Sequence, residues 1–209
     1  MLDILQQVAT VYEQNGRVRL WWRGHADSSW RLHPSIYHRG LAHAESSMYA
    51  AFHQAAPAID PTLASRTQNL DWLFLMQHHG LPTRLLDWSE SALVALYFAA
   101  SHVPDNQVDG TIWWLDPATV NQAELGESKM MGAGGPDIWR IASGALGGQG
   151  DDPEQSRIAA FYPDQTEPRH MVQRAQCTIH GREQPLEDMN SLRLGRIDIP
   201  AARKAEVWR

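Results

Sequence analysis

Apolar residues three or four positions apart predict several helices along the chain. In the opening segment, residues 1–16, this spacing joins Leu5, Val8, Val11 and Tyr12 and ends before Gly16, so we expect an amphipathic helix that packs on the core. Composition, capping residues and flanking prolines predict five more helices, over about 43–56, 69–79 and 90–100, from Asp116–Pro117 onward, and from about 201 to 206.

Short runs of apolar and aromatic residues predict strands between these helices. Two runs contain adjacent tryptophans, at 19–24 and 110–116, and three further runs, at 158–162, 177–180 and 194–199, alternate well enough to be strands. Helical blocks come before most of these strands, without a regular alternation of strand and helix. We therefore expect an α+β fold in which helices flank a mixed sheet.

Two segments lack a clear period. Glycine is concentrated between residues 126 and 152, including Gly132-Ala133-Gly134-Gly135 and the stretch from Gly144 to Gly150. We expect residues 126–152 to form a mobile connection or flap without packed structure. Residues 81–89, which contain Pro82, are expected to be irregular or extended.

Composition narrows the class of protein. The 209 residues are 43% hydrophobic and 20% charged, which is typical of one globular domain over residues 1–209. The net charge of −6 argues against a chain that coats nucleic acid or an anionic membrane. Residues 1–16 have neither the charge pattern of an export signal nor the apolar length of a membrane span. Because the chain has a single cysteine, Cys177, we expect it to be cytoplasmic. We also expect it to have no membrane partner.

Several catalytic motifs are absent from the sequence. There is no His-Glu-x-x-His pattern and no cysteine pair, so we expect no metal site. There is also no Gly-x-Ser-x-Gly elbow and no phosphate-binding loop that ends in Gly-Lys-Ser/Thr. Cys177 and His180 are three positions apart on a predicted strand and point to opposite faces, so Cys177 is expected to be a core residue.

Three segments together resemble the FRG domain family. They are Trp21-Trp22-Arg23-Gly24 with Trp30, Leu32, Pro34 and Ser35; residues 77–89, QHHGLPTRLLDWS, with Ala95, Leu96, Phe98 and Ala99; and Arg169 with Gln173 and Cys177-Thr178-Ile179-His180. The resemblance extends from about Val18 to Pro200. Trp22 departs from the usual Phe of the family, and Cys177 stands where an aromatic residue is usual. Members usually continue for some tens of residues beyond this point, which implies a shortened C-terminus here.

The order of polar residues is also similar to the layout of ADP-ribosyltransferases. In both, an Arg-Gly ends the first strand, a Ser/Thr turn enters an apolar helix, and a polar residue lies on a late strand. This similarity implies an ADP-ribosyltransferase-like fold with NAD as substrate and a macromolecule, protein or nucleic acid, as acceptor. It also implies a prokaryotic toxin or phage-defence effector, with an antitoxin or regulatory partner.

The same resemblance implies roles for individual residues. Arg23, with Gly24 and His25 beside it, would hold the pyrophosphate or a ribose. Four residues at or after the end of the predicted helix at 69–79 would shape the part of the site that holds the nicotinamide: His79, Thr83, Arg84 and Ser89. Gln173 would contact the ribose next to the bond that breaks, and residues 126–152 would cover the ligand or present the acceptor.

Each of these residues also has a structural explanation. A buried Arg23 needs a carboxylate such as Asp87 or a bound anion. His78 and His79 suit the last turn of a helix because of its dipole, and Ser89 suits an N-cap. Both explanations stay open at this point.

The reaction itself also has alternatives. Gln173 has no negative charge for an oxocarbenium-like transition state, and Asp164, Glu167 or Glu183 would have to supply one. Without such a charge, the chain would be a non-catalytic nucleotide- or nucleic-acid-binding module. A third possibility is a hydrolase with His78 or His79 as its base.

Overall fold

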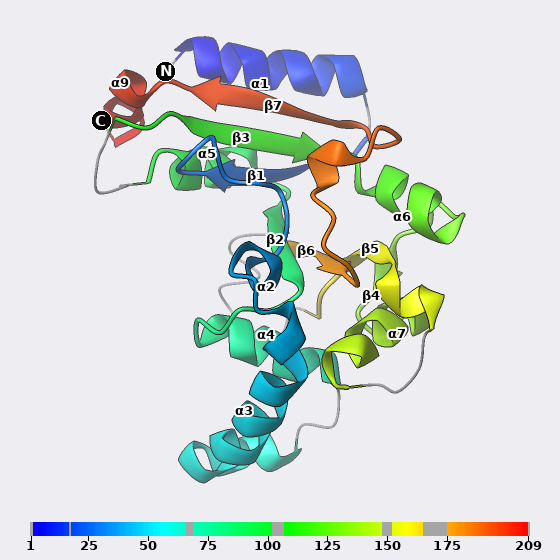
Figure 1. The fold of residues 1–209 in the computed structure, drawn as a ribbon. Helices are drawn as coiled ribbons and strands as arrows, with labels where there is room; N and C mark the ends of the chain where they lie inside the picture. The colour runs from blue at the N-terminus through cyan, green and yellow to red at the C-terminus, as the bar shows by residue number, and fades with distance from the viewer. Residues whose placement is uncertain are drawn as a thin grey trace.

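A seven-stranded sheet runs through the molecule in the order β4-β5-β6-β2-β1-β3-β7 (Figure 1). The computed structural model describes residues 2–16, 18–65, 69–101, 107–147, 152–164 and 175–208. The strands are β1 Trp21–His25, β2 Leu85–Ser89, β3 Gly110–Leu115, β4 Met131–Gly132, β5 Ile158–Tyr162, β6 Ala175–His180 and β7 Leu194–Ile199. Neighbouring strands are antiparallel except β4 and β5, which confirms the expected mixed sheet.

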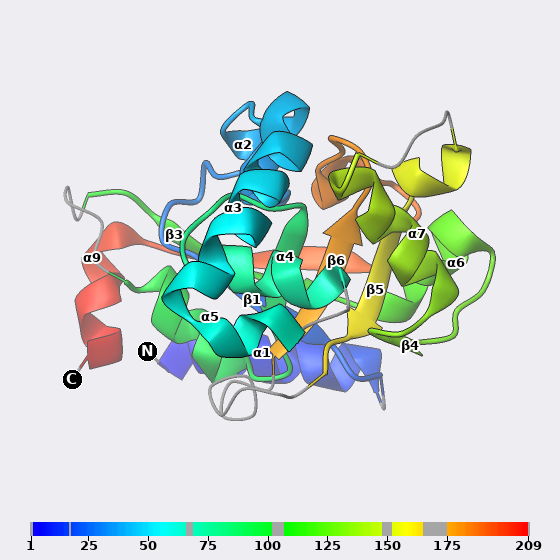
Figure 2. The same ribbon diagram turned by 90° about the horizontal axis from the view of Figure 1, so that it is seen from below.

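Helices flank the sheet, as the α+β prediction requires (Figure 2). The α-helices are α1 Leu2–Asn15, α2 Ser35–His38, α3 Glu45–Ile59, α4 Asn69–His78, α5 Ala92–Ala99, α6 Pro117–Leu125, α7 Pro136–Ala145 and α9 Ala201–Lys204. Short 3-10 turns occupy Ala42–Ala44, Pro61–Ser65, Pro153–Ser156, Leu186–Asp188 and Ala205–Trp208. No helix in these described ranges is long and apolar enough to cross a membrane.

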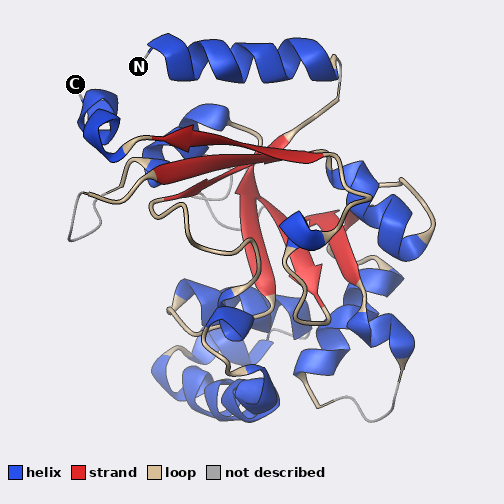
Figure 3. Ribbon diagram, turned by 45° about the horizontal axis from the view of Figure 1, so that its top comes forward, coloured by secondary structure: helices blue, strands red, loops and turns tan. Residues whose placement is uncertain are grey.

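The sheet is divided at the contact between β1 and β2. These two strands share a single residue pair, Trp22 with Ser89, whereas β1 follows β3 over its full length and β2 follows β6 in the same way. Figure 3 shows that β1, β3 and β7 run across the molecule while β2, β6 and β5 run down it. The strands therefore diverge at this junction, and side chains from both halves meet there.

Three apolar clusters pack on the two halves of the sheet. One lies between α1, α5 and the β1-β3-β7 half and includes Trp22 and Leu96; a second packs α4 and α7 on the β2-β6-β5 half and includes Leu73 and Phe161. The third fills the opposite face, between α6 and the strands, around Trp21. A smaller cluster joins α3 to α4. Burial of both sheet faces accounts for the apolar strands in the sequence.

The opening helix is confirmed, but its buried face differs from the predicted one. Ile4 and Val11 are buried against the sheet, whereas Leu5 and Tyr12 are exposed. Ile4, Val11 and Asn15 lie on one stripe because they are separated by seven and four residues. The buried stripe therefore begins at Ile4, one residue before the predicted start at Leu5.

The prediction of an unpacked segment over residues 126–152 is wrong for residues 136–145. Residues 136–145 form α7, in which Ile138, Ile141, Ala142 and Ala145 are buried at helical spacing. Pro136 occupies the first turn, which suits proline because it lacks an amide N–H. The glycines of this segment flank the helix more than they interrupt it; residues 148–151 lie outside the described part.

Two helix boundaries differ from the predictions, whereas the extended structure expected within residues 81–89 is confirmed. Residues 85–89 form a regular strand, β2, and the following helix starts at Ala92 with Ser91 as its N-cap rather than Ser89. Helix α3 continues past Pro57 to Ile59, because a proline in the last turn costs only one internal hydrogen bond. The expected cap at Asp116 is confirmed, since its carboxylate accepts from the N–H of Ala118 at 3.2 Å.

Candidate functional site

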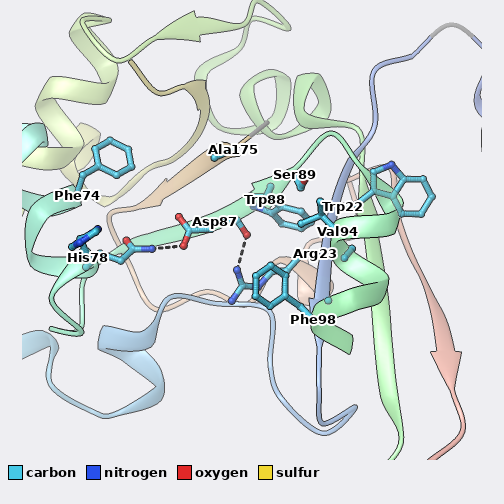
Figure 4. Close-up of a pocket in the computed structure, with 13 residues that line it drawn as sticks. Trp22, Arg23, Phe74, His78, Asp87, Trp88, Ser89, Val94, Phe98 and Ala175 are labelled. Carbon is cyan, nitrogen blue, oxygen red and sulfur yellow. Dashed lines mark hydrogen bonds between the residues drawn. The ribbon is translucent and has the colours of Figure 1, made fainter. Parts of the chain in front are cut away.

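A pocket of about 500 Å³ opens where the two halves of the sheet diverge (Figure 4). We call it the β1–β2 pocket. This volume is within the range of small-molecule sites. Strands β1, β2 and β6 and helices α4 and α5 contribute its lining, which is Trp22, Arg23, Gly24, Phe74, Gln77, His78, Asp87, Trp88, Ser89, Val94, Ala95, Phe98 and Ala175.

Arg23 is held in this pocket by two uncharged acceptors. Its Nε donates to Nε2 of His25 at 3.0 Å, and its Nη1 donates to the main-chain oxygen of Asp87 at 2.6 Å. Within the described ranges, no carboxylate forms an ion pair with this guanidinium. The predicted ion pair between Arg23 and the side chain of Asp87 is therefore wrong. Burial lowers the pKa of Arg23 and the charge of Asp87 partly opposes this, but an arginine stays protonated at neutral pH.

His25 supports Arg23 from outside the pocket lining. Its side chain is buried, and burial, followed by the charge of Arg23, lowers the pKa of His25 to about 3. The imidazole is therefore neutral at pH 7, which leaves Nε2 able to accept the hydrogen bond from Arg23. The predicted contact between His25 and a ribose is replaced by this supporting role.

Gln77 and Thr83 fix the side chain of Asp87. Thr83 Oγ1 donates to Gln77 Oε1 at 3.0 Å, which directs the amide nitrogen of Gln77 to a carboxylate oxygen of Asp87. Thr83 is fully buried and does not line the pocket. Contrary to the prediction, Thr83 would therefore not contact a ligand itself but would act on the pocket by orienting Gln77.

Arg84 is a correction, because the structure places it in the core. Its guanidinium binds Glu45 through Nε at 2.9 Å and Nη2 at 2.6 Å, and Nη1 donates to the main-chain oxygen of Ile141 at 2.9 Å. Glu45 also accepts from the main-chain N–H of Arg84. With its charge neutralised by a buried carboxylate, Arg84 is not available to bind a phosphate.

The remaining predicted residues divide between the pocket and other places. Gly24 and Ser89 line the pocket, and Ser89 Oγ accepts from the N–H of Ser91 at 3.0 Å in the turn that enters α5. His79 is exposed and packs on Phe52, outside the lining. Gln173 lies outside the described residues.

The carboxylates suggested for the late strand are not in the lining. Asp164 and Glu183 are both exposed and away from the pocket, and Glu167 lies outside the described residues. Cys177 is buried, and burial raises its pKa, in keeping with a core residue. In the described ranges, no group of three His, Cys, Asp or Glu residues could hold a metal ion.

The sequence analysis assigned no ligand-binding role to Asp87 or Phe74, which both line the pocket. Asp87 and Ser89 are two positions apart on β2 and therefore lie on the same face of this strand. A prediction of a strand at residues 85–89 would have placed the two side chains together. Phe74 and His78 are likewise four positions apart on α4. Asp87 had been considered only as an ion-pair partner of Arg23.

Comparison with known proteins gives one match. The family model of the FRG domain matches residues 18–107, a span that contains every lining residue except Ala175. No curated protein and no solved structure matches the chain.

Proposed function

Because the chain carries an FRG domain at residues 18–107, we propose that this domain binds NAD in the β1–β2 pocket and transfers ADP-ribose to a macromolecule. The observation that carries this proposal is the guanidinium of Arg23, which is charged, lines the pocket and, among the described residues, donates hydrogen bonds only to neutral acceptors. A charge in such a place is stabilised by an anionic ligand. The pyrophosphate of NAD is an anion of this kind.

The rest of the lining suits the other parts of NAD. Phe74, Trp88 and Phe98 provide aromatic surface on which a nicotinamide or adenine ring can stack (Figure 4). Gln77 and Ser89 provide polar groups that can hydrogen-bond an amide or a ribose hydroxyl. An apolar pocket with few polar groups is the usual form of a cofactor site.

The wider role follows from the similarity to ADP-ribosyltransferases noted in the sequence. The acceptor is a protein or nucleic acid, and the chain acts as a toxin or phage-defence effector in the cytoplasm of a prokaryote. An antitoxin or regulatory partner restrains it. The contact of Gln173 with the reacting ribose stays a prediction, because Gln173 lies outside the described residues.

A second candidate is a nucleotide-binding module without turnover. It is favoured by one observation, that no glutamate is among the described residues that line the pocket. The two candidates share the ligand and differ in whether the glycosidic bond breaks.

Release of nicotinamide from NAD separates the two candidates. We expect the wild-type chain to release nicotinamide in the presence of a whole-cell extract that supplies the acceptor. Arg23→Gln should lower this rate at least about 100-fold, because it removes the charge that orients the substrate. Chromatography of nicotinamide measures the rate directly.

Arg196→Gln is the matched control. Arg196 lies on β7 of the same half of the sheet, is half-exposed over the ring of Trp113, and is not in the pocket lining. This variant removes the same charge and should keep the wild-type rate. Equal rates in the wild type and Arg23→Gln would refute transfer at this pocket, and binding without release would favour the module.

A further inference from the structure

Asp87 brings a negative charge into the same pocket as Arg23. It lies on β2, is exposed, and is the one acidic residue among the described residues of the lining. Figure 4 shows that the main-chain oxygen of Asp87 is directed to the guanidinium of Arg23. A pocket with a single fixed cation and a single fixed anion selects ligands that carry both charges.

The carboxylate of Asp87 is held in position before any ligand binds. Gln77 Nε2 donates to Oδ2 of Asp87, and Thr83 fixes the orientation of that amide through its bond to Oε1 at 3.0 Å. No hydrogen bond to Oδ1 is present in the described part of the chain. One carboxylate oxygen is thus used for positioning, which leaves the other to accept from a ligand in the pocket that Asp87 lines.

Arg23 and Asp87 do not neutralise each other by side-chain contact. The guanidinium binds the main-chain oxygen of Asp87 at 2.6 Å, so one residue anchors the cation with its backbone and presents an anion with its side chain. The two charges are therefore fixed at a short separation and both stay accessible to a ligand. NAD⁺ matches this arrangement, with an anionic pyrophosphate on one side of a ribose and a cationic nicotinamide ring on the other.

We infer that Asp87 recognises the cationic nicotinamide riboside, so that the pocket selects NAD⁺ over NADH and stabilises the ribosyl cation as the glycosidic bond breaks. This inference rests on the proposed function. In the reaction, the bond between ribose C1′ and the nicotinamide nitrogen breaks and its electron pair goes to that nitrogen, which becomes neutral. The acceptor forms a bond to C1′ and releases its proton to water. The positive charge moves from the ring to the ribose, where a fixed carboxylate stabilises it.

Asp87→Asn tests this inference with little change in shape. The asparagine keeps an oxygen that accepts from Gln77, and it removes only the charge. Calorimetric titration of NAD⁺ and NADH should show that the wild type prefers NAD⁺ by about tenfold and that Asp87→Asn loses this preference. Nicotinamide release by the variant should fall at least about 100-fold.

Glu90→Gln is the matched control. Glu90 is three positions away, accepts from Gln176 at 3.0 Å and does not line the pocket. It should keep both the preference for NAD⁺ and the rate of release. A loss of preference in this control as well would overturn the assignment to Asp87, because a general loss of negative charge would then explain the result.

The outcomes separate this inference from the proposed function. If the wild type binds NAD⁺ and NADH equally well, or if Asp87→Asn keeps the preference, the role of Asp87 is overturned while NAD binding stands. If the wild type binds neither nucleotide, the proposed function fails and takes this inference with it.

Discussion

Replacement of Gly24 by alanine is expected to lower the free energy of unfolding by about 3 kcal/mol or more. A Cβ atom at Gly24 would lie 1.9 Å from the main-chain oxygen of Ala95 and 2.6 Å from the main-chain nitrogen of Ala99. Both atoms belong to the backbone of α5, so no side-chain movement relieves the contact. Helix α5 would have to move away from β1, which would also open the wall of the pocket. Urea denaturation measures the loss.

Gly132→Ala is the control for this effect. A Cβ at Gly132 meets no atom within 4 Å, and its backbone does not require a glycine. Its unfolding free energy should stay within about 0.5 kcal/mol of the wild type. A Gly24→Ala chain as stable as Gly132→Ala would show that α5 does not pack on β1 as closely as described.

Glu45→Ala is expected to destabilise the fold by roughly 3–5 kcal/mol, because it leaves a buried guanidinium without its counter-charge. Glu45 and Arg84 are both buried and are joined by hydrogen bonds to the guanidinium and to the main-chain N–H of Arg84. After the substitution, the guanidinium of Arg84 would keep only the main-chain oxygen of Ile141 among its described partners. Thermal and urea unfolding measure the loss.

Asp3→Ala is the control for the ion pair. Asp3 pairs with Arg203 at 2.9 Å, but its side chain is 74% exposed. Water already solvates both charges, so this substitution should change the stability little. If Glu45→Ala were no more harmful than Asp3→Ala, the pair of Glu45 and Arg84 would not be a buried structural contact.

Local patterns were sufficient for many elements of the fold. The strands at 158–162 and 194–199 have the predicted bounds because each is a short run followed directly by a proline, Pro163 or Pro200. The helix after Asp116 begins where its cap and Pro117 indicated. By contrast, α7 was missed because glycines on both sides concealed four apolar residues at helical spacing.

The site was predictable only where it depends on neighbours in sequence. Arg23, Gly24 and Ser89 reach the pocket, and all three lie at the ends of short segments that the motifs identified. Arg84 was misassigned because its partner, Glu45, is 39 residues away and no local pattern connects them. Such long-range pairs are a property of the packed fold and do not follow from spacing.

Binding of NAD at Arg23 is the central claim, and thermal unfolding with and without NAD tests it most directly. A ligand that binds only the folded state raises the midpoint, by roughly 5–10 °C at about 100 times its Kd for a chain of this size. We expect this rise in the wild type and in Arg196→Gln, and none in Arg23→Gln. A folded wild type with an unchanged midpoint at millimolar NAD, or an equal rise in Arg23→Gln, would contradict it.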